Sequence, residues 1–421
     1  MTERTEPTAT EPTATTTERT ADPDPVSPGL AGLIGPAEVA GFLKHSLGQA
    51  VYRTRLAPAA AAELFGWPQL NAALAEHRLA PPRLRLERAG ADVTHGIFRA
   101  RRTRRGAVLQ DLDVAALTAS LRDGATLIVD AVNEISPPLQ RLCAGLSAEL
   151  TAASQANLYA CWGVTQGFDV HWDDHDVFVV QVEGRKQWAL YGPTKPAPTR
   201  RGPAADAPSP QGEPEQIVLG PGDVLYLPRG HWHAAVGLGE PTLHLTIGLT
   251  RKTGGDLFQW LADEVFADEI GRADLPFEAG DAAVAERLAR LVAGLAARDP
   301  QDLARRYRRH VEALQPQRPA LSFPHIGEEE APLAAGAELS LAPGPARLRR
   351  SERGLVLSWR GVEFTLAPDL EPLLRRLLAG ETASIDAFGR AAPGASAAQL
   401  QGFLREMLRR GVFVVRADAA P

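Results

Sequence analysis

The chain has 421 residues and a formal net charge of −6 at pH 7, and its content of 44% hydrophobic and 23% charged residues is typical of a soluble globular protein. The length predicts two or three domains, since one domain holds roughly 100 to 200 residues. No run approaches about 18 consecutive apolar residues, and no basic segment followed by an apolar run opens the chain, so we expect neither a membrane span nor a secretory signal, and a cytoplasmic location.

The distribution of charges and cysteines excludes further classes of protein. Residues 1–30 hold six acids and two arginines, so the remainder is nearly neutral and has no basic surface that would indicate nucleic acid or membrane binding. Cys143 and Cys161 are too few for a disulfide framework or a four-cysteine zinc site, which agrees with a reducing compartment. Residues 1–30 are also rich in Thr, Pro and Glu, which predicts a disordered tail.

The segment after the tail predicts a mixture of helices and strands. Apolar residues recur at helical spacing from residue 35 to about residue 77, so short helices are expected there. The stretch "RLRLERAG" alternates like a strand, "LDVAALTASLRDGA" predicts a helix that ends at a glycine, and "TLIVDAV" predicts a short apolar strand. The stretch "SPPLQRLCAGLSAELT" then predicts another amphipathic helix.

Residues 155–250 predict a β-sandwich or barrel. Short segments rich in β-branched and aromatic residues follow one another here and are separated by Gly and Pro, as "VFVVQVEG", "KQWALYGP" and "DVLYLPRG" illustrate. Residues 194–214 are rich in Pro and predict a long loop inserted into this barrel. With the helices that precede it, the barrel is expected to form a domain over residues 31–250 in an α+β fold.

The remainder of the chain predicts two further regions. Three segments with helical periodicity indicate a helical region over residues 251–330, which we expect to pack on a neighbouring domain or a second subunit. Over residues 331–421 the predicted order of two strands, two helices and a strand resembles a winged helix. This region has 12 arginines against 9 acids, an excess too small to predict DNA binding.

The hexapeptide "HWDDHD", which starts at His171, contains the first candidate metal ligands. Alternate side chains of a strand share a face, so His171 and Asp173 would point to one side. The turn "PRGHWHAAV" offers His231 or His233 as a third ligand. The two residues are two positions apart, so on a strand both would point to the same face. Two histidines and one carboxylate make the facial triad of non-haem Fe(II) oxygenases, which leaves coordination positions open. Read alone, however, the hexapeptide is more typical of a solvated acidic turn.

Other polar and aromatic residues of this region have structural interpretations. Asp174, His175 and Asp176 are expected to be polar residues of a turn, and His244 in the apolar stretch "TLHLTIGL" is by itself more typical of a hydrogen-bonded core histidine. Three tryptophans are expected to pack the barrel: Trp172, Trp188 and Trp232.

Lys186 and the order of the motifs change this interpretation. Lys186 ends the "VFVVQVEGRK" stretch in a chain whose 45 basic residues include only four lysines, and an interior cation there could pair with a dianionic co-substrate. The motifs "NLY", "QGFDVHWDDHDVFVVQVEGRKQW", "VLGPGDVLYLPRGHWHAA" and "TLHLTIGLT" occur in this order. Residues 155–250 thereby resemble the JmjC-type cupin of the ribosomal oxygenases, a family of 2-oxoglutarate- and Fe(II)-dependent protein hydroxylases.

The resemblance implies a fold, cofactors and partners. It implies a double-stranded β-helix of the cupin or jelly-roll type with flanking helices, a helical dimerisation region and a C-terminal winged helix. It further implies Fe(II), 2-oxoglutarate and O2 as the reactive partners, a protein side chain, possibly of a ribosomal protein, as the substrate, and a homodimer. The site residues that it implies are His171, Asp173 and His233 for iron, Lys186 and Tyr159 for the distal carboxylate of 2-oxoglutarate, and Asn157 and His244 around the co-substrate.

Alternatives stay open at this point. The same site would serve a hydroxylase of a biosynthetic peptide or small metabolite, and a non-catalytic cupin could use its winged helix and dimer for binding or regulation. Lys186 and Tyr159 argue against the non-catalytic alternative, because a binding module has no need to hold 2-oxoglutarate. Cupin isomerases and dioxygenases of other types usually lack the cation after the HxD element. His175 and the insertion at residues 194–214 depart from the family pattern, and both could alter the choice of substrate.

Overall fold

A computed structural model describes residues 16–17, 29–201, 208–315, 320–323, 333 and 337–416. The chain divides into two compact units, the first with residues 1–143 and 154–250 and the second with residues 144–153 and 251–421. Apart from two residues, the predicted disordered tail lies outside the described residues, as does part of the insertion. The domain boundaries expected from the sequence stay predictions.

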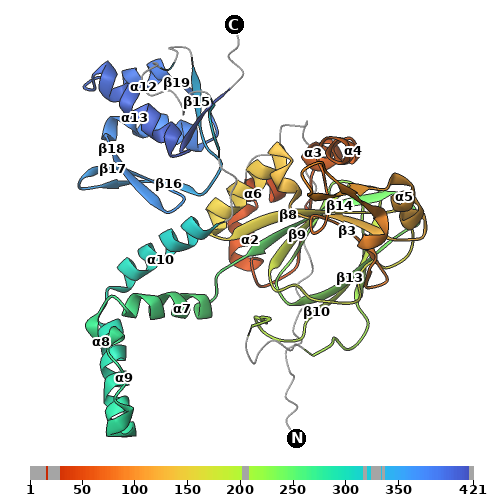
Figure 1. Ribbon diagram of the computed structural model, residues 1–421, viewed down its shortest axis with the longest axis horizontal. Helices are drawn as coiled ribbons and strands as arrows, with labels where there is room; N and C mark the ends of the chain where they lie inside the picture. Colours follow the sequence, from red (N-terminus) through yellow and green to blue (C-terminus); the bar gives the residue numbers. More distant parts are fainter. Residues whose placement is uncertain are drawn as a thin grey trace, which may run out of the picture. The chain divides into compact units, whose positions relative to one another are not determined.

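The first unit contains two sheets that face each other around a common core and are mainly antiparallel, with a short parallel pair at the edge of the larger one (Figure 1). The smaller sheet has the order β11-β10-β13, with strands β10 (Lys186–Pro193), β11 (Glu215–Leu219) and β13 (His231–Gly237). The larger sheet has the order β1-β2-β12-β9-β14-β8-β7-β3-β4. Its strands are β1 (Thr16–Thr17), β2 (Tyr52–Arg55), β3 (Leu84–Arg88), β4 (Ala91–Asp92), β7 (Thr126–Val129), β8 (Ala153–Cys161), β9 (Asp176–Glu183), β12 (Asp223–Leu227) and β14 (Thr242–Thr250).

Apolar side chains from both sheets hold this barrel together. β9 is buried along almost its whole length, and β12 and β14 pair with its two edges. Burial of both faces agrees with its sequence, which contains four valines and Phe178. The core between the sheets consists of Val177, Val179, Trp188, Leu190, Ile217, Leu219, Leu225 and Leu227. The expected cupin-type barrel within an α+β fold is thereby confirmed.

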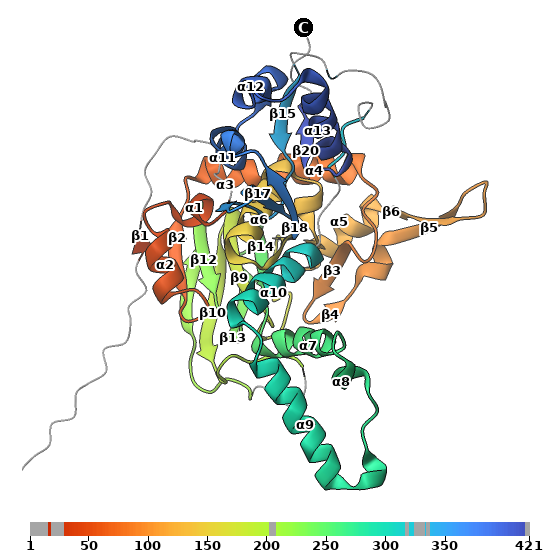
Figure 2. The same ribbon diagram turned by 90° about the vertical axis from the view of Figure 1, so that its left-hand side faces the viewer.

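Helices flank the larger sheet, as the sequence predicts, but the opening of the unit differs from the expectation. The helices are α1 (Leu30–Ile34), α2 (Val39–His45), α3 (Pro58–Phe65), α4 (Trp67–Glu76), α5 (Val114–Arg122) and α6 (Pro137–Leu150). Between α2 and α3 the chain forms β2, which pairs with the edge of β12, so helices alone do not cover this segment. The hairpin of β5 (Phe98–Arg102) and β6 (Val108–Leu112) was also not expected, because β5 is rich in arginine and largely exposed (Figure 2).

The helical part of the second unit contains α7 (Gly254–Val265), α8 (Glu269–Arg272), α9 (Asp281–Ala296) and α10 (Pro300–Leu314). The three segments with helical periodicity therefore form helices as expected. Thr253 and Asp256 form a capping box at the start of α7, and the Asp299 carboxylate caps α10, so side chains satisfy the first backbone N–H groups of both helices. Across the described ranges no helix has the length and apolar character needed to cross a membrane.

The C-terminal part of the second unit has more elements than the sequence predicts. Its elements are β15 (Glu338–Leu341), β16 (Ala346–Ser351), β17 (Gly354–Trp359), β18 (Val362–Leu366), α11 (Glu371–Leu378), β19 (Ala383–Ser384), α12 (Ile385–Ala391), α13 (Ala397–Arg409) and β20 (Phe413–Val415). β16, β17 and β18 form one sheet, and β19, β15 and β20 form another. Phe388, Leu404 and Phe413 are fully buried where the helices pack on the strands. The winged helix stays a prediction.

Candidate metal centre

His171, Asp173 and His233 form a cluster that could hold a metal ion. Each offers one ligand atom, and these three atoms lie within 4.8 Å of one another. The His233 Nε2 atom is 3.7 Å from the Asp173 Oδ2 atom, and the centroids of the two imidazole rings are 4.5 Å apart. In the part of the chain that the structure describes, no other set of His, Cys, Asp or Glu meets the criteria of a metal cluster.

Backbone contacts between two segments distant in the sequence place these ligands together. His171 and His233 form an isolated antiparallel bridge, in which the His171 amide donates to the His233 carbonyl (3.1 Å) and the His233 amide donates to the His171 carbonyl (2.8 Å). The Gly230 amide also donates to the Asp173 carbonyl (3.1 Å). The sequence predicted a continuous strand through "HWD", whereas β9 begins only at Asp176, so the segment that carries two ligands is held by this bridge instead of a regular ladder.

Hydrogen bonds orient both imidazole rings toward the cluster. His171 Nδ1 is 2.7 Å from the Asp169 carbonyl oxygen, and His233 Nδ1 is 2.9 Å from the His231 carbonyl oxygen. A carbonyl can only accept, so Nδ1 carries a proton in both rings, and Nε2 is the ring nitrogen that could bind a metal. Burial is the main cause that lowers the pKa of His233, against the opposing effect of Asp173, and this favours the neutral ligand form.

The structure separates these ligands from the neighbouring histidines. Of the two candidates with equal parity, His233 joins the cluster, whereas His231 lies outside it with its Nδ1 3.2 Å from the Pro228 carbonyl oxygen. His175 packs over Gly248 of β14, because a Cβ atom at residue 248 would lie 2.8 Å from its ring. Asp176 is buried, not a surface residue, and its carboxylate accepts a 2.8 Å hydrogen bond from the Arg229 amide.

A cavity of about 240 Å³ opens beside the cluster inside the barrel. The cluster residues themselves line it, and so do three of the four residues expected around a co-substrate, namely Lys186, Tyr159 and His244. Asn157 is not among the lining residues. Its Oδ1 atom accepts a 2.9 Å hydrogen bond from the Ala131 amide, and its side chain is hydrogen-bonded to Tyr159, so it lies behind the cavity wall.

Lys186 provides a buried cation in this cavity. Its side chain lies at the first residue of β10, is 5% exposed, and makes no ion pair with any described residue. Burial lowers the pKa of its ammonium group, and Cys161 opposes this effect. A buried charge without a counter-ion is costly, so this position favours a ligand that carries negative charge.

Further polar groups in the cavity wall lack protein partners. The His244 Nδ1 and Trp188 Nε1 atoms are buried without a hydrogen bond to any described residue. Burial, and then the nearby Lys186 cation, hold the pKa of His244 well below its usual value, so this ring is neutral. Native proteins rarely leave buried polar groups unsatisfied, so these atoms and Lys186 together fit an oxygen-rich anionic ligand.

Tyr159 is a hydroxyl donor at the same wall. Burial, followed by the negative charge of Asp173, raises the pKa of its phenol to about 12, so the hydroxyl stays protonated. The Tyr159 and His244 rings are stacked, with centroids 5.0 Å apart and planes 8° apart. This stacking fixes the position of both side chains without a bound ligand.

Arg85 and Trp188 also belong to the cavity wall, although neither was expected there from the sequence. Arg85 lines it and is held from behind by Asp130, through hydrogen bonds of 2.8 and 3.3 Å. The stretch "RLRLERAG" alternates between apolar and polar residues, and this alternation places Arg85 on the strand face opposite to the buried Leu84 and Leu86. Trp188 packs the barrel as expected, but it also lines the cavity.

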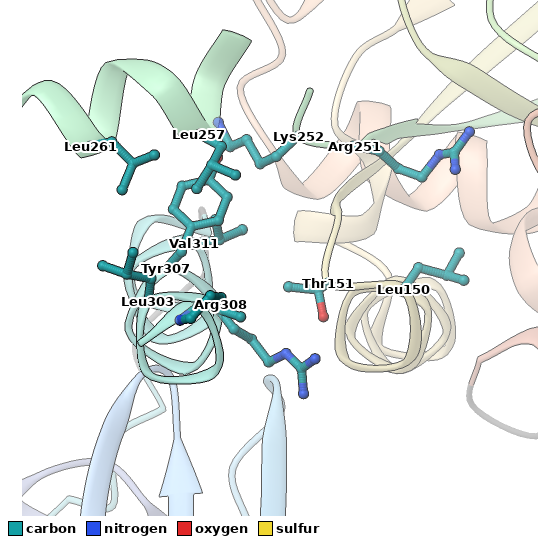
Figure 3. A pocket seen from close by; sticks show the side chains of 12 residues that line it. Leu150, Thr151, Arg251, Lys252, Leu257, Leu261, Leu303, Tyr307, Arg308 and Val311 are labelled. Carbon is teal, nitrogen blue, oxygen red and sulfur yellow. The ribbon is translucent and has the colours of Figure 1, made fainter. Parts of the chain in front are cut away.

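A larger cavity, of about 530 Å³, lies in the second unit between α7, α10 and the end of α6 (Figure 3). Figure 3 shows Leu257, Tyr307 and Val311 on one wall and Leu150 and Thr151 on the other. Its walls are mainly apolar and include no His, Cys, Asp or Glu. We therefore assign the chemistry to the smaller cavity, because only that one combines candidate ligands with a buried cation.

Comparisons with known proteins find similarity in the same region. Residues 132–257 match the family model of the JmjC domain. The bifunctional lysine-specific demethylase and histidyl-hydroxylase NO66 of Drosophila persimilis is 40% identical over 111 residues, which is 26% of this chain and 16% of that protein. Human ribosomal oxygenase 1 is 35% identical over 152 residues, 34% of this chain and 23% of that protein. The chain thus spans a quarter or less of the length of these curated relatives.

Solved structures are similar over a greater length. The crystal structure of the Escherichia coli ribosomal oxygenase YcfD superposes with a TM-score of 0.56 and 16% identity, and it covers 90% of this chain and 98% of that one. A structure of YcfD in complex with cobalt and 2-oxoglutarate superposes with the same TM-score and 17% identity. At such identities the likeness shows a shared fold.

Proposed function

We propose that this chain, whose residues 132–257 match the JmjC domain, belongs to the ribosomal oxygenase family and is an Fe(II)- and 2-oxoglutarate-dependent oxygenase that hydroxylates a protein side chain. The observation that carries the proposal is the buried Lys186, which has no carboxylate partner among the described residues and shares one cavity with the His171, Asp173 and His233 cluster. A metal cluster alone would fit many activities. The added cation selects an acidic co-substrate.

The residues present fit both proposed ligands. Two imidazoles and one carboxylate are a donor set that suits Fe(II) and leaves positions open. The Lys186 ammonium and the Tyr159 hydroxyl would hold the distal carboxylate of 2-oxoglutarate, and the YcfD structure with cobalt and 2-oxoglutarate supports this choice of ligand. When bound, iron, 2-oxoglutarate and O2 supply the oxidising power for hydroxylation of a C–H bond. The protein contributes ligation, orientation and exclusion of water.

The first test is turnover of 2-oxoglutarate to succinate with added Fe(II). Asp173→Ala removes the only carboxylate of the cluster, so metal binding and turnover should both be lost, whereas Asp174→Ala should behave like the wild type. Lys186→Ala should still bind metal but need roughly ten- to hundredfold more 2-oxoglutarate, the effect of losing a hydrogen bond to a charged group. Turnover by Asp173→Ala at the wild-type rate would contradict the proposal.

We further propose that the substrate is a ribosomal protein. The names of the curated relatives and of the structurally similar bacterial protein support this choice, and it agrees with the cytoplasmic location that the sequence predicts. Mass spectrometry of ribosomal proteins from a deletion strain should show that one of them has lost a +16 Da modification. Identical masses in the deletion and parent strains would favour the peptide or small-metabolite alternative.

We also propose that the protein is a homodimer and that its helical region forms the interface. No residue of α9 is buried, although Leu288 and Val292, one helical turn apart, are 59% and 58% exposed. Phe258 of α7 and Phe277 are 68% and 69% exposed. Exposed apolar side chains that are neighbours on one helix, as Leu288 and Val292 are, are typical of interaction surfaces.

A further inference from the structure

The start of the Pro-rich insertion contacts the outer side of both metal-binding segments. Trp172 lies between the ligands His171 and Asp173, and Trp232 directly precedes His233. Neither tryptophan lines the cavity, so their side chains point away from the ligands, as alternation along an extended chain requires. Trp172 is nevertheless only 6% exposed, so other parts of the protein cover it.

Arg200 from the insertion makes two contacts with Trp172. The Arg200 Nη2 atom donates a 2.8 Å hydrogen bond to the Trp172 carbonyl oxygen. Its Cζ atom also lies 5.1 Å from the centroid of the Trp172 ring, within the range of a cation–π interaction. The carbonyl belongs to the peptide group that joins Trp172 to Asp173. Arg200 therefore restrains the backbone immediately before a candidate metal ligand.

Two more contacts reach the segment that carries the third ligand. The Trp232 Nε1 atom donates a 2.9 Å hydrogen bond to the Thr194 hydroxyl. The buried Pro198 packs against Gly230, where a Cβ atom would lie only 2.2 Å from the proline Cγ atom. Gly230 also has a φ of +85°, so its residue type is required both by its conformation and by the close approach of the insertion.

The segment with His171 and Asp173 has few other restraints on its position. It lies outside the regular strands, and its backbone is tied to β13 by the bridge at His171 and to the preceding turn by the Gly230 amide. A metal site requires ligand positions fixed to within about 0.5 Å by surrounding contacts. Arg200 and Thr194 contact the tryptophans next to the ligands, and Pro198 contacts Gly230, whose amide donates to the Asp173 carbonyl.

We infer that residues 194–200 form a brace, defined by the contacts of Thr194, Pro198 and Arg200, that holds the two metal-binding segments from outside the barrel. Arg200 is a positioning residue for Asp173, and it acts through the Trp172 peptide without touching the metal or the co-substrate. This inference depends on the metal site of the proposed function. It gives the start of the insertion a role that does not involve substrate choice.

The test measures binding of Co(II) by calorimetry together with the visible absorption of the bound Co(II), so no turnover is needed. Arg200→Ala should weaken Co(II) binding about tenfold, at the lower end of the effect of removing a residue that supports a metal ligand, and should alter the absorption bands. Arg200→Lys should recover part of the affinity, because lysine keeps the charge and a donor but lacks the planar group that stacks on Trp172. Thr194→Val should cause a smaller loss.

The matched control is Arg105→Ala, which removes the same type of side chain from the exposed turn of the β5–β6 hairpin and should leave Co(II) binding unchanged. Unchanged affinity and absorption in Arg200→Ala would overturn the brace, even if that variant melts at a lower temperature. If the wild-type protein itself binds no Co(II), the metal site of the proposed function fails together with the brace. If the wild type binds Co(II) and Arg200→Ala binds it with the same affinity and absorption, only the brace is contradicted.

Discussion

Lys186 makes the proposed binding of 2-oxoglutarate sensitive to alkaline pH. Burial lowers the pKa of its ammonium group below the usual 10.5, so the free protein loses this charge at a lower pH than an exposed lysine would. Only the charged form pairs with a carboxylate. The affinity for 2-oxoglutarate should therefore fall as pH rises through the lowered pKa of Lys186, and stay constant below it where the lysine is charged.

Isothermal titration with 2-oxoglutarate over a range of pH checks this prediction. Lys186→Arg keeps its charge throughout, since the guanidinium pKa exceeds 12, so its affinity should show no alkaline decline even if it is weaker overall. The same alkaline decline in both proteins would assign the effect to another group.

At the scale of single residues, the sequence pointed to the three residues that the structure brings into one cluster. His171 and Asp173 share a parity, and His233 follows a glycine turn. The choice between His231 and His233 needed the backbone bridge, which joins positions about sixty residues apart. Arg85 was missed because its role depends on Asp130 and on the neighbouring strand, neither of which a single stretch of sequence reveals.

At the scale of elements, the contact of His175 with β14 depends on a glycine. A Cβ atom at residue 248 would come within 2.8 Å of two ring atoms of His175, so the ring or the strand would have to shift. Gly248→Ala should lower the free energy of unfolding by about 1–3 kcal/mol, the range for overpacking a folded site. The double variant with His175→Ala should recover most of that loss, because the alanine leaves room for the new Cβ.

Urea unfolding followed by tryptophan fluorescence would measure these changes. Gly41→Ala is the control, because Gly41 lies within α2, has no atom within 4 Å of an added Cβ, and should gain about 0.5–1 kcal/mol from helix propensity. A Gly248→Ala protein as stable as the wild type would show that His175 moves away freely.

The predicted elements were most accurate where apolar periodicity is strong. β9, α6, α9 and α10 lie where the patterns place them. β2 and β5 were missed because these two strands have few apolar residues, so cross-strand pairing and not burial defines them. The break between the "HWD" segment and β9 was missed because residues 171–183 read as one extended stretch.

At the scale of the whole molecule, the exposed apolar face of α9 predicts that single charges disrupt assembly. Leu288→Glu or Val292→Glu would bury a carboxylate in the proposed interface, so light scattering after gel filtration should show the mass of one chain where the wild type shows that of two. Arg290→Glu, on the opposite face of the same helix, should stay dimeric. A wild-type protein with the mass of a single chain would contradict the proposed homodimer.

The backbone bridge between His171 and His233 bears on when a metal can enter the protein. Closing a loop of about sixty residues costs entropy that the paired strands of the barrel must first offset, and the apolar core between the two sheets contains none of the three ligands. We therefore expect the barrel to assemble before the ligand set is complete, unlike a zinc finger, whose metal drives folding. Iron would act on the lifetime of the native state, by slowing its unfolding, and would leave the rate of folding unchanged.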